Sequence, residues 1–182
     1  MGQSGCGKST LEKELCKAYP AVFKKVVSFV TRPKRDGEID GQDYHFLTHE
    51  EVDNTHPFQS TVFNHHVYGT MLREYTTPHS HLTFVITPNA AAETIPKLKE
   101  QFPGIKILLI YFDISLPVLC RNMDSRGDSK EMIAHRLLND DLKQQFIDRE
   151  LVADYVVTDN TLDTWLSMDV LRWLKVVNLD SL

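Results

Sequence analysis

The first ten residues of the chain, MGQSGCGKST, satisfy the pattern G-x-x-x-x-G-K-[ST]. Glycines in this pattern let successive backbone N–H groups point at phosphate oxygens, and the lysine reaches the terminal phosphates. The hydroxyl after the lysine, here on Ser9, is a ligand for Mg²⁺. The pattern therefore predicts a nucleoside triphosphate site made of Gly2, Gln3, Ser4, Gly5, Cys6, Gly7, Lys8, Ser9 and Thr10.

A second group of anion-binding side chains lies in the stretch SFVTRPKRDGEIDGQDYHF. Ser28, Arg32 and Arg35 follow a predicted strand, and Tyr44 comes shortly after them. Arginine offers forked donors that match phosphate oxygens, and hydroxyl groups complete such a site. A second anion site in a chain with a triphosphate loop indicates phosphoryl transfer to a phosphate-bearing acceptor. The alternative is that these arginines are solvated loop charges.

Strands that alternate with helices must position these loops. The run 8–19 predicts a helix, because Leu11, Leu15 and Tyr19 recur at helical spacing before Pro20. Strands are predicted at 25–30, 81–86, 105–112 and 154–159, and helices at 89–102, 115–123, 129–151 and 161–177. Within the second helix, Pro96 is expected to begin a separate piece. This order predicts a parallel α/β sheet covered on both faces, with a small β-rich insert that contains hairpins before about Thr70.

One feature of the phosphate loop is unusual. Such loops follow a buried strand that holds them rigid, whereas only Met1 precedes Gly2. We expect a start upstream of Met1 that supplies this strand. The alternative is a protein without its central strand.

Composition limits the class of protein. The 182 residues are 42% hydrophobic and 25% charged, as in one soluble globular domain. No apolar run approaches the roughly 20 residues of a membrane helix, and the net charge of −5 argues against a nucleic-acid binder. The three cysteines show neither disulfide nor zinc spacing, and the polar start is unlike a secretory signal. We expect a cytoplasmic monomer or homodimer with no nucleic-acid or membrane partner.

Taken together, the motifs resemble those of the guanylate kinases. That family has a loop GxSGxGKST, here GQSGCGKST, and a block TR-x-x-R-x-GE-x-x-G-x-DY-x-F, here TRPKRDGEIDGQDYHF. The family also has a YG[ST] element, here Tyr68–Thr70, and an RG pair in a lid, here Arg126–Gly127. A later arginine corresponds to Arg136, and a strand like DYVIVND corresponds to DYVVTDN. The resemblance spans nearly the whole chain. It implies a P-loop NTPase-type parallel sheet flanked by helices, with a β-rich acceptor-binding insert and a helical lid.

The resemblance also implies an organisation and an activity. One domain would cover 1–182, with a core of about 1–27, 82–120 and 145–182, an insert of about 28–78 and a lid of about 121–144. The activity would be ATP-dependent phosphoryl transfer to a nucleoside monophosphate, from GMP to GDP, with Mg²⁺ as cofactor. The implied catalytic residues are Lys8, Arg32, Arg126 and Arg136. The implied acceptor-binding residues are Ser28, Arg32, Arg35, Tyr44, Gln59, Tyr68, Thr70 and Thr87.

The chain departs from the family where the base is read. Gln59 stands in the place of a guanine-reading glutamate, and Val85 and Thr87 stand in the places of two aspartates. A carboxylate accepts hydrogen bonds from the ring N–H and the amino group of guanine together, which an amide or a hydroxyl cannot do. We therefore expect weaker guanine binding. Val85 also removes an acidic residue on the magnesium side. Asp113 is a candidate substitute, but a helix-capping or turn role is the favoured interpretation of Asp113.

The lid departs too. Asn122 occupies the place of a lid arginine, with Arg121 beside it, and the spacing from Arg126 to Arg136 is one residue shorter than usual.

Two alternatives to a guanylate kinase remain open. One is a kinase for another phosphorylated acceptor, such as a sugar phosphate. The other is a non-catalytic nucleotide-binding module, which the retained Lys8, Ser9, Arg126 and Arg136 disfavour.

Overall fold

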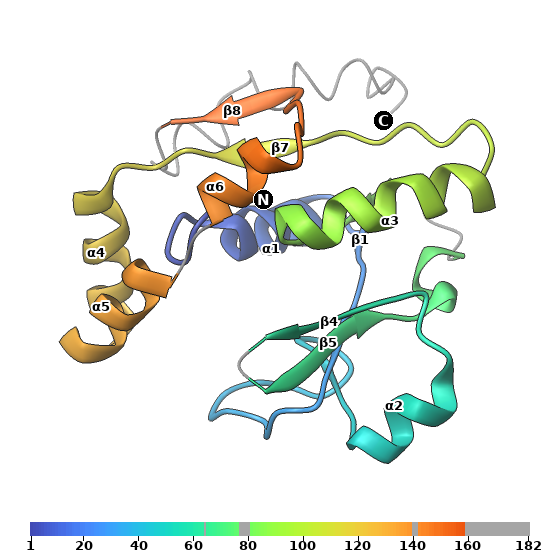
Figure 1. The fold of residues 1–182 in the computed structure, drawn as a ribbon, viewed down its shortest axis with the longest axis horizontal. Helices are drawn as coiled ribbons and strands as arrows, with labels where there is room; N and C mark the ends of the chain where they lie inside the picture. Colours follow the sequence, from blue (N-terminus) through green and yellow to red (C-terminus); the bar gives the residue numbers. More distant parts are fainter. Residues whose placement is uncertain (64, 77–80, 140–141, 159–182) are drawn as a thin grey trace. The chain divides into compact units, whose positions relative to one another are not determined.

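The computed structural model describes residues 1–63, 65–76, 81–139 and 142–158 (Figure 1). The chain folds into two compact units. We call the first, Met1–Leu11 with Ile107–Leu182, the loop unit, and the second, Glu12–Lys106, the middle unit. The predicted helix over 161–177 lies outside the described residues. Over the described ranges, no helix has both the length and the apolarity to cross a membrane.

The loop unit is built on parallel strands, as the sequence predicts. β7 (Ile110–Phe112) pairs in parallel with β8 (Tyr155–Val157). On β7, Gly2 forms a parallel bridge to Phe112, and the Phe112 N–H donates to the Met1 carbonyl at 2.9 Å. The first residues of the phosphate loop are therefore held at the end of β7. Helix α1 (Lys8–Ala18) begins immediately after the loop.

Three further helices of the loop unit are described. α4 (Leu116–Ser125) buries Leu119 and Met123, which lie one helical turn apart. α5 (Lys130–Asn139) and α6 (Leu142–Asp148) fall within the range 129–151, for which the sequence predicts one long helix, and residues 140–141 between them lie outside the described residues. The ring of Phe146 on α6 stacks on Tyr111 of β7, with centroids 4.4 Å apart.

In the middle unit, β1 (Phe23–Lys25) pairs in parallel with β6 (His81–Thr83). α3 (Pro88–Gln101) follows β6 and contains Pro96 in its interior, so the expected break at Pro96 is wrong. Pro96 removes only one backbone hydrogen bond. The buried face of α3, which includes Ala91, Thr94 and Leu98, outweighs that loss because packing of an apolar face stabilises a helix most.

The middle unit also contains a small sheet with the order β3-β2-β5-β4. Its strands are β2 (Phe29–Val30), β3 (His45–Phe46), β4 (Gln59–Phe63) and β5 (His66–Thr70). β4 and β5 are antiparallel neighbours, which confirms the predicted hairpin.

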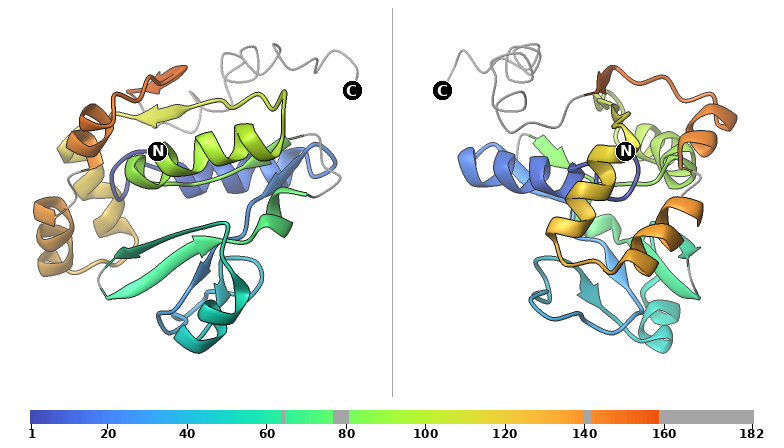
Figure 2. Two further views of the ribbon diagram at one scale, coloured as in Figure 1. Left: turned by 45° about the vertical axis from the view of Figure 1, so that its right-hand side comes forward. Right: turned by 90° about the vertical axis from the view of Figure 1, so that its left-hand side faces the viewer.

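Two helical segments of the middle unit were not predicted, the short 3-10 helix η1 (Leu72–Tyr75) and the α-helix α2 (His49–Thr55). Helix α2 begins at a capping box, in which the Glu51 N–H donates to the Thr48 hydroxyl at 3.1 Å and the Thr48 N–H donates to the Glu51 carboxylate at 2.7 Å. The spacing Thr-x-x-Glu is the sequence signal that would have revealed it. α2 packs against the small sheet (Figure 2), where Val52 meets Phe29 and Met71 in a buried cluster.

Glu12 is a buried carboxyl group on α1, only 7% exposed. Burial raises its pKa from 4.5 to about 7, against the attraction of Lys25, whose ammonium lies 4.0 Å away. The unfolded chain therefore loses this proton near pH 4.5, whereas the folded protein keeps it until about pH 7.

This difference predicts that the contribution of Glu12 to the free energy of unfolding decreases as pH rises from about 4.5 to 7. The stabilisation from Glu12 is complete below pH 4.5 and lost above pH 7, a change of about 3 kcal/mol at 1.36 kcal/mol per pKa unit. Glu12→Gln should remove this slope and be the more stable protein at pH 8. Urea unfolding of both proteins at pH 5, 6, 7 and 8 measures it, and parallel pH profiles would contradict the prediction.

Candidate functional site

The phosphate loop has the backbone conformation that its glycines predict. Gly2, Gly5 and Gly7 have positive φ angles of 139°, 82° and 99°. At Gly2 a Cβ atom would lie 2.7 Å from the Phe112 carbonyl oxygen, so only glycine fits beside β7. The loop then enters α1, where the Leu11 N–H donates to the Gly7 carbonyl at 3.0 Å. The loop thus leads directly into a helix N-terminus, which favours bound anions.

Lys8 folds back over this loop. Its ammonium donates to the carbonyl oxygens of Gly2 at 2.6 Å and Gln3 at 2.8 Å, and it lies 3.3 Å from the thiol of Cys6. Cys6 is fully buried. The loop therefore holds the lysine by weak neutral acceptors, which phosphate oxygens can replace with stronger charge-assisted bonds.

Ser9 lies in the first turn of α1 and is exposed, as is Thr10. A hydroxyl oxygen at this place is a hard ligand of the kind Mg²⁺ takes, with substrate phosphates and water supplying the rest. Among the described residues, no group of three or more His, Cys, Asp or Glu is arranged to hold a metal. Ser9 fits a magnesium that is bound mainly through its nucleotide.

Asn122 supports the phosphate loop from α4. Its side-chain amide donates to the Gly5 carbonyl oxygen at 2.8 Å. Gly5 itself lies against α4, since a Cβ there would be 3.0 Å from the Leu119 carbonyl oxygen. In the sequence, Asn122 was notable only because it replaces a lid arginine. The structure makes it a positioning residue for the loop.

Asn122→Ala should therefore loosen the loop without removing any group that binds phosphate. We expect the KM for ATP to rise about 5- to 10-fold, the effect of one lost hydrogen bond, with a smaller change in kcat and none in the KM for the acceptor. Steady-state kinetics with each substrate varied in turn measure this. An unchanged KM for ATP would contradict a positioning role.

The two predicted lid arginines converge on one carboxylate. Arg126 and Arg136 each place a guanidinium nitrogen 3.0 Å from the same oxygen of Asp128. Asp128 was missed by sequence reasoning, and its position directly after the RG pair was the available signal. The structure thus brings Arg126 and Arg136 together.

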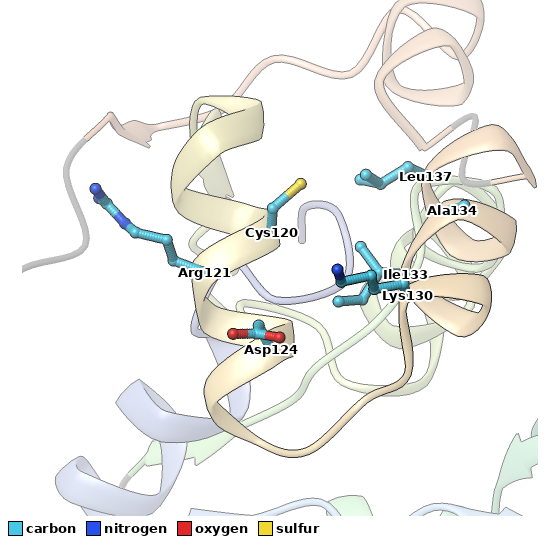
Figure 3. A pocket seen from close by; sticks show the side chains of 7 residues that line it. All are labelled: Cys120, Arg121, Asp124, Lys130, Ile133, Ala134 and Leu137. Carbon is cyan, nitrogen blue, oxygen red and sulfur yellow. The ribbon is translucent and has the colours of Figure 1, made fainter.

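A cavity of about 420 Å³ lies between α4 and α5 (Figure 3). The guanidinium end of Arg121 points away from α5, whereas Cys120 and Leu137 project into the space between the helices. The residues that line the cavity are Cys120, Arg121, Asp124, Lys130, Ile133, Ala134 and Leu137.

Arg32 is the centre of the second group of predicted residues. It is only 8% exposed and forms a two-pronged ion pair with Glu38, at 2.7 Å from Nη1 to Oε2 and 2.5 Å from Nη2 to Oε1. This pairing lowers the pKa of Glu38 to about 2 and raises that of Arg32. The guanidinium also lies 5.2 Å from the ring centre of Tyr44, which in turn packs edge-on against Tyr68. Arg32, Tyr44 and Tyr68 therefore form one cluster.

Ser28 and Arg35 border this cluster along the chain. The Ser28 carbonyl accepts from the His45 N–H at 2.9 Å, which ties it to the small sheet. The Arg35 side chain is exposed, and its backbone N–H donates to Glu38 at 2.8 Å. Glu38, for which the sequence predicts no role of its own, thus binds the side chain of Arg32 and the backbone of Arg35.

The residues expected to read the base occupy two places in the middle unit. Gln59 and Thr70 are directly opposite each other on β4 and β5, and both are buried. Thr87 is the N-cap of α3, where its hydroxyl oxygen accepts from the Ala90 N–H at 3.4 Å. Val85 follows β6 and brings no polar side chain.

Comparisons with known proteins agree on one family. The family model described as guanylate kinase matches residues 1–171. A guanylate kinase of Chlorobium luteolum is 31% identical over 165 residues, which cover 88% of this chain and 81% of that protein. One from Shewanella violacea is 32% identical, with 90% and 79% covered. The crystal structure of guanylate kinase from Anaplasma phagocytophilum superposes with a TM-score of 0.58 at 20% identity, covering 98% of this chain and 84% of that chain, which establishes the shared fold.

Proposed function

The chain belongs to the guanylate kinase family, and we propose that it transfers the terminal phosphoryl group of ATP to GMP, forming ADP and GDP. The enzyme is a nucleoside monophosphate kinase of that family. We also propose Mg²⁺ as its cofactor, and a cytoplasmic monomer or homodimer without nucleic-acid or membrane partners. The division into core, insert and lid with the bounds given above is part of the same proposal.

The observation that carries this function is the Arg32 cluster. A buried guanidinium, oriented by Glu38 and lying over the ring of Tyr44, would bind a phosphate dianion through the N–H donors that are not bonded to Glu38. A structural ion pair alone would not require two tyrosines beside it. A chain that also has an intact triphosphate loop then holds both a donor site and an acceptor site for phosphoryl transfer.

On the donor side, the ATP phosphates would contact the backbone N–H groups of residues 2–10. Lys8 would exchange the carbonyls of Gly2 and Gln3 for phosphate oxygens, because charged acceptors bind an ammonium more strongly. Ser9 would hold Mg²⁺, which when bound neutralises phosphate charge.

On the acceptor side, the phosphate of GMP would bind Arg32 and Arg35 with the hydroxyls of Ser28, Tyr44 and Tyr68. An oxygen of that phosphate attacks the terminal phosphorus of ATP, and the bond from that phosphorus to the oxygen of ADP breaks.

The lid arginines would act on the group in transfer. Arg126 and Arg136 both form an ion pair with Asp128. The transferring phosphoryl group would accept hydrogen bonds from the N–H groups of the two arginines that do not contact Asp128. Excluding water during this step protects ATP from hydrolysis.

A panel of acceptors tests the function. Purified protein with ATP and Mg²⁺ is supplied with GMP, AMP, CMP, UMP or a sugar phosphate, and ADP release is measured. Turnover with GMP supports the proposal. Turnover with a sugar phosphate alone would favour the related kinase, and nucleotide binding without ADP release would favour a binding module.

A further inference from the structure

Gln59 has a buried amide nitrogen without a hydrogen-bond partner among the described residues. The residue is 4% exposed, and the atom without a partner is Nε2. A buried N–H donor without an acceptor is unfavourable, so native proteins rarely keep one without a reason. A ligand that brings an acceptor to this amide would satisfy it.

The amide shares a sheet face with the phosphate-binding side chains. Gln59 is opposite Thr70 in the antiparallel pair, so both side chains lie on one face. Tyr68 lies two residues before Thr70 and therefore on that face as well, about 7 Å along the strand. Tyr68 packs against Tyr44, over which Arg32 lies. A nucleoside monophosphate with its phosphate on Arg32 would thus bring its base toward Gln59.

The hydroxyls of the two other residues expected to read the base, Thr70 and Thr87, do not replace a carboxylate. The Thr70 hydroxyl is paired with the Tyr75 hydroxyl at 3.0 Å. The Thr87 hydroxyl oxygen already accepts from the N-terminus of α3. The main reader of the base edge is then an amide, which offers one acceptor and one donor, whereas a carboxylate offers acceptors only.

This difference changes which edge of a purine fits. Guanine presents, in order, the acceptor O6, the donor N1–H and the donor 2-amino group. A carboxylate pairs with the two donors, but an amide pairs with an adjacent donor and acceptor, here N1–H and O6. Hypoxanthine has the same O6 and N1–H and lacks only the 2-amino group.

We propose that the acceptor site binds 6-oxopurine nucleoside monophosphates through O6 and N1–H at Gln59, without reading the 2-amino group. IMP is then a substrate comparable with GMP. This inference rests on the proposed kinase function and names its range of acceptors.

The test compares kcat/KM for GMP and IMP, at saturating ATP, in the wild type and in Gln59→Glu. We expect a GMP to IMP ratio below about 10 in the wild type. Gln59→Glu should raise that ratio about 10- to 100-fold, the effect of a hydrogen bond to a charged group. A wild type that prefers GMP by more than about 100-fold, or a ratio that Gln59→Glu leaves unchanged, would overturn the proposal, as would faster turnover of AMP than of either.

Two further variants keep the test decisive. Gln42→Glu adds the same charge at an exposed site of the middle unit and should leave the ratio unchanged. Gln59→Leu removes both amide contacts, and should raise the KM for GMP and for IMP by the same factor of about 10. Binding of GMP and IMP without ATP, followed by calorimetry, should show the same ratios. If ADP is released with none of the acceptors, the proposed kinase function is wrong. If GMP is turned over and IMP is not, the kinase function stands and only the inference about Gln59 is wrong.

Discussion

Replacing Lys8 with alanine is expected to lower kcat for phosphoryl transfer about 10³-fold, which corresponds to roughly 4 kcal/mol of transition-state stabilisation. The ammonium of Lys8 contacts the phosphate loop directly, with its nitrogen 2.6 Å from the Gly2 carbonyl oxygen. Phosphoryl transfer is accelerated mainly by positioning and by charge, so no other part of the loop can replace this group. Initial rates of ADP formation with saturating ATP and GMP measure the loss.

Lys13→Ala is the matched control, because Lys13 lies exposed on the same helix and away from the loop. It should retain at least half of the wild-type rate. Thermal unfolding of both variants should stay close to the wild type, since Lys8 is held only by neutral carbonyls and a thiol. A Lys8→Ala protein with more than a tenth of normal activity would contradict the assignment of the triphosphate site.

Replacing Arg32 with methionine has the second large expected effect. We expect kcat/KM for the acceptor to fall about 10²- to 10³-fold, with the KM for ATP nearly unchanged, because the buried guanidinium that would bind the acceptor phosphate is lost. The variant also removes the ion pair between Arg32 and Glu38. We therefore expect the free energy of unfolding to fall by about 1–3 kcal/mol. Steady-state kinetics and urea unfolding measure the two effects separately.

Two variants distinguish the role of Arg32 from general loss of charge. Arg73→Met removes an arginine of the middle unit whose side chain is 69% exposed, and should leave kcat/KM unchanged. Arg32→Lys keeps the charge but not the planar fork, so it should recover less than a tenth of the lost activity. Full recovery by lysine, or an equal loss in Arg73→Met, would show that Arg32 acts only through net charge.

Local patterns predicted much of the fold. The loop from Gly2 to Gly7 and helix α1 were readable because glycine and lysine spacing encode a backbone shape directly. The β4–β5 hairpin was readable as well. The sequence was misleading at Pro96, where local preference for a break was overridden by the packing of α3.

Part of the candidate site could likewise be predicted from local patterns, and part of it could not. Residue types and spacing, together with the resemblance they carry, by themselves indicated the family and the triphosphate loop, and they singled out Arg32 and Arg35 as candidates for the acceptor site. The loop and the stretch that contains the two arginines are short continuous motifs, which can be read directly from the sequence. Only the tertiary structure decided that Asp128 holds both lid arginines, that Asn122 supports Gly5 from α4, and that the amide of Gln59 is buried without a partner. The contacts of Asp128 and Asn122 join residues from 2 to 117 positions apart in the sequence, and a local pattern does not encode distance in space. The state of the Gln59 amide depends on burial, which a local pattern does not encode either.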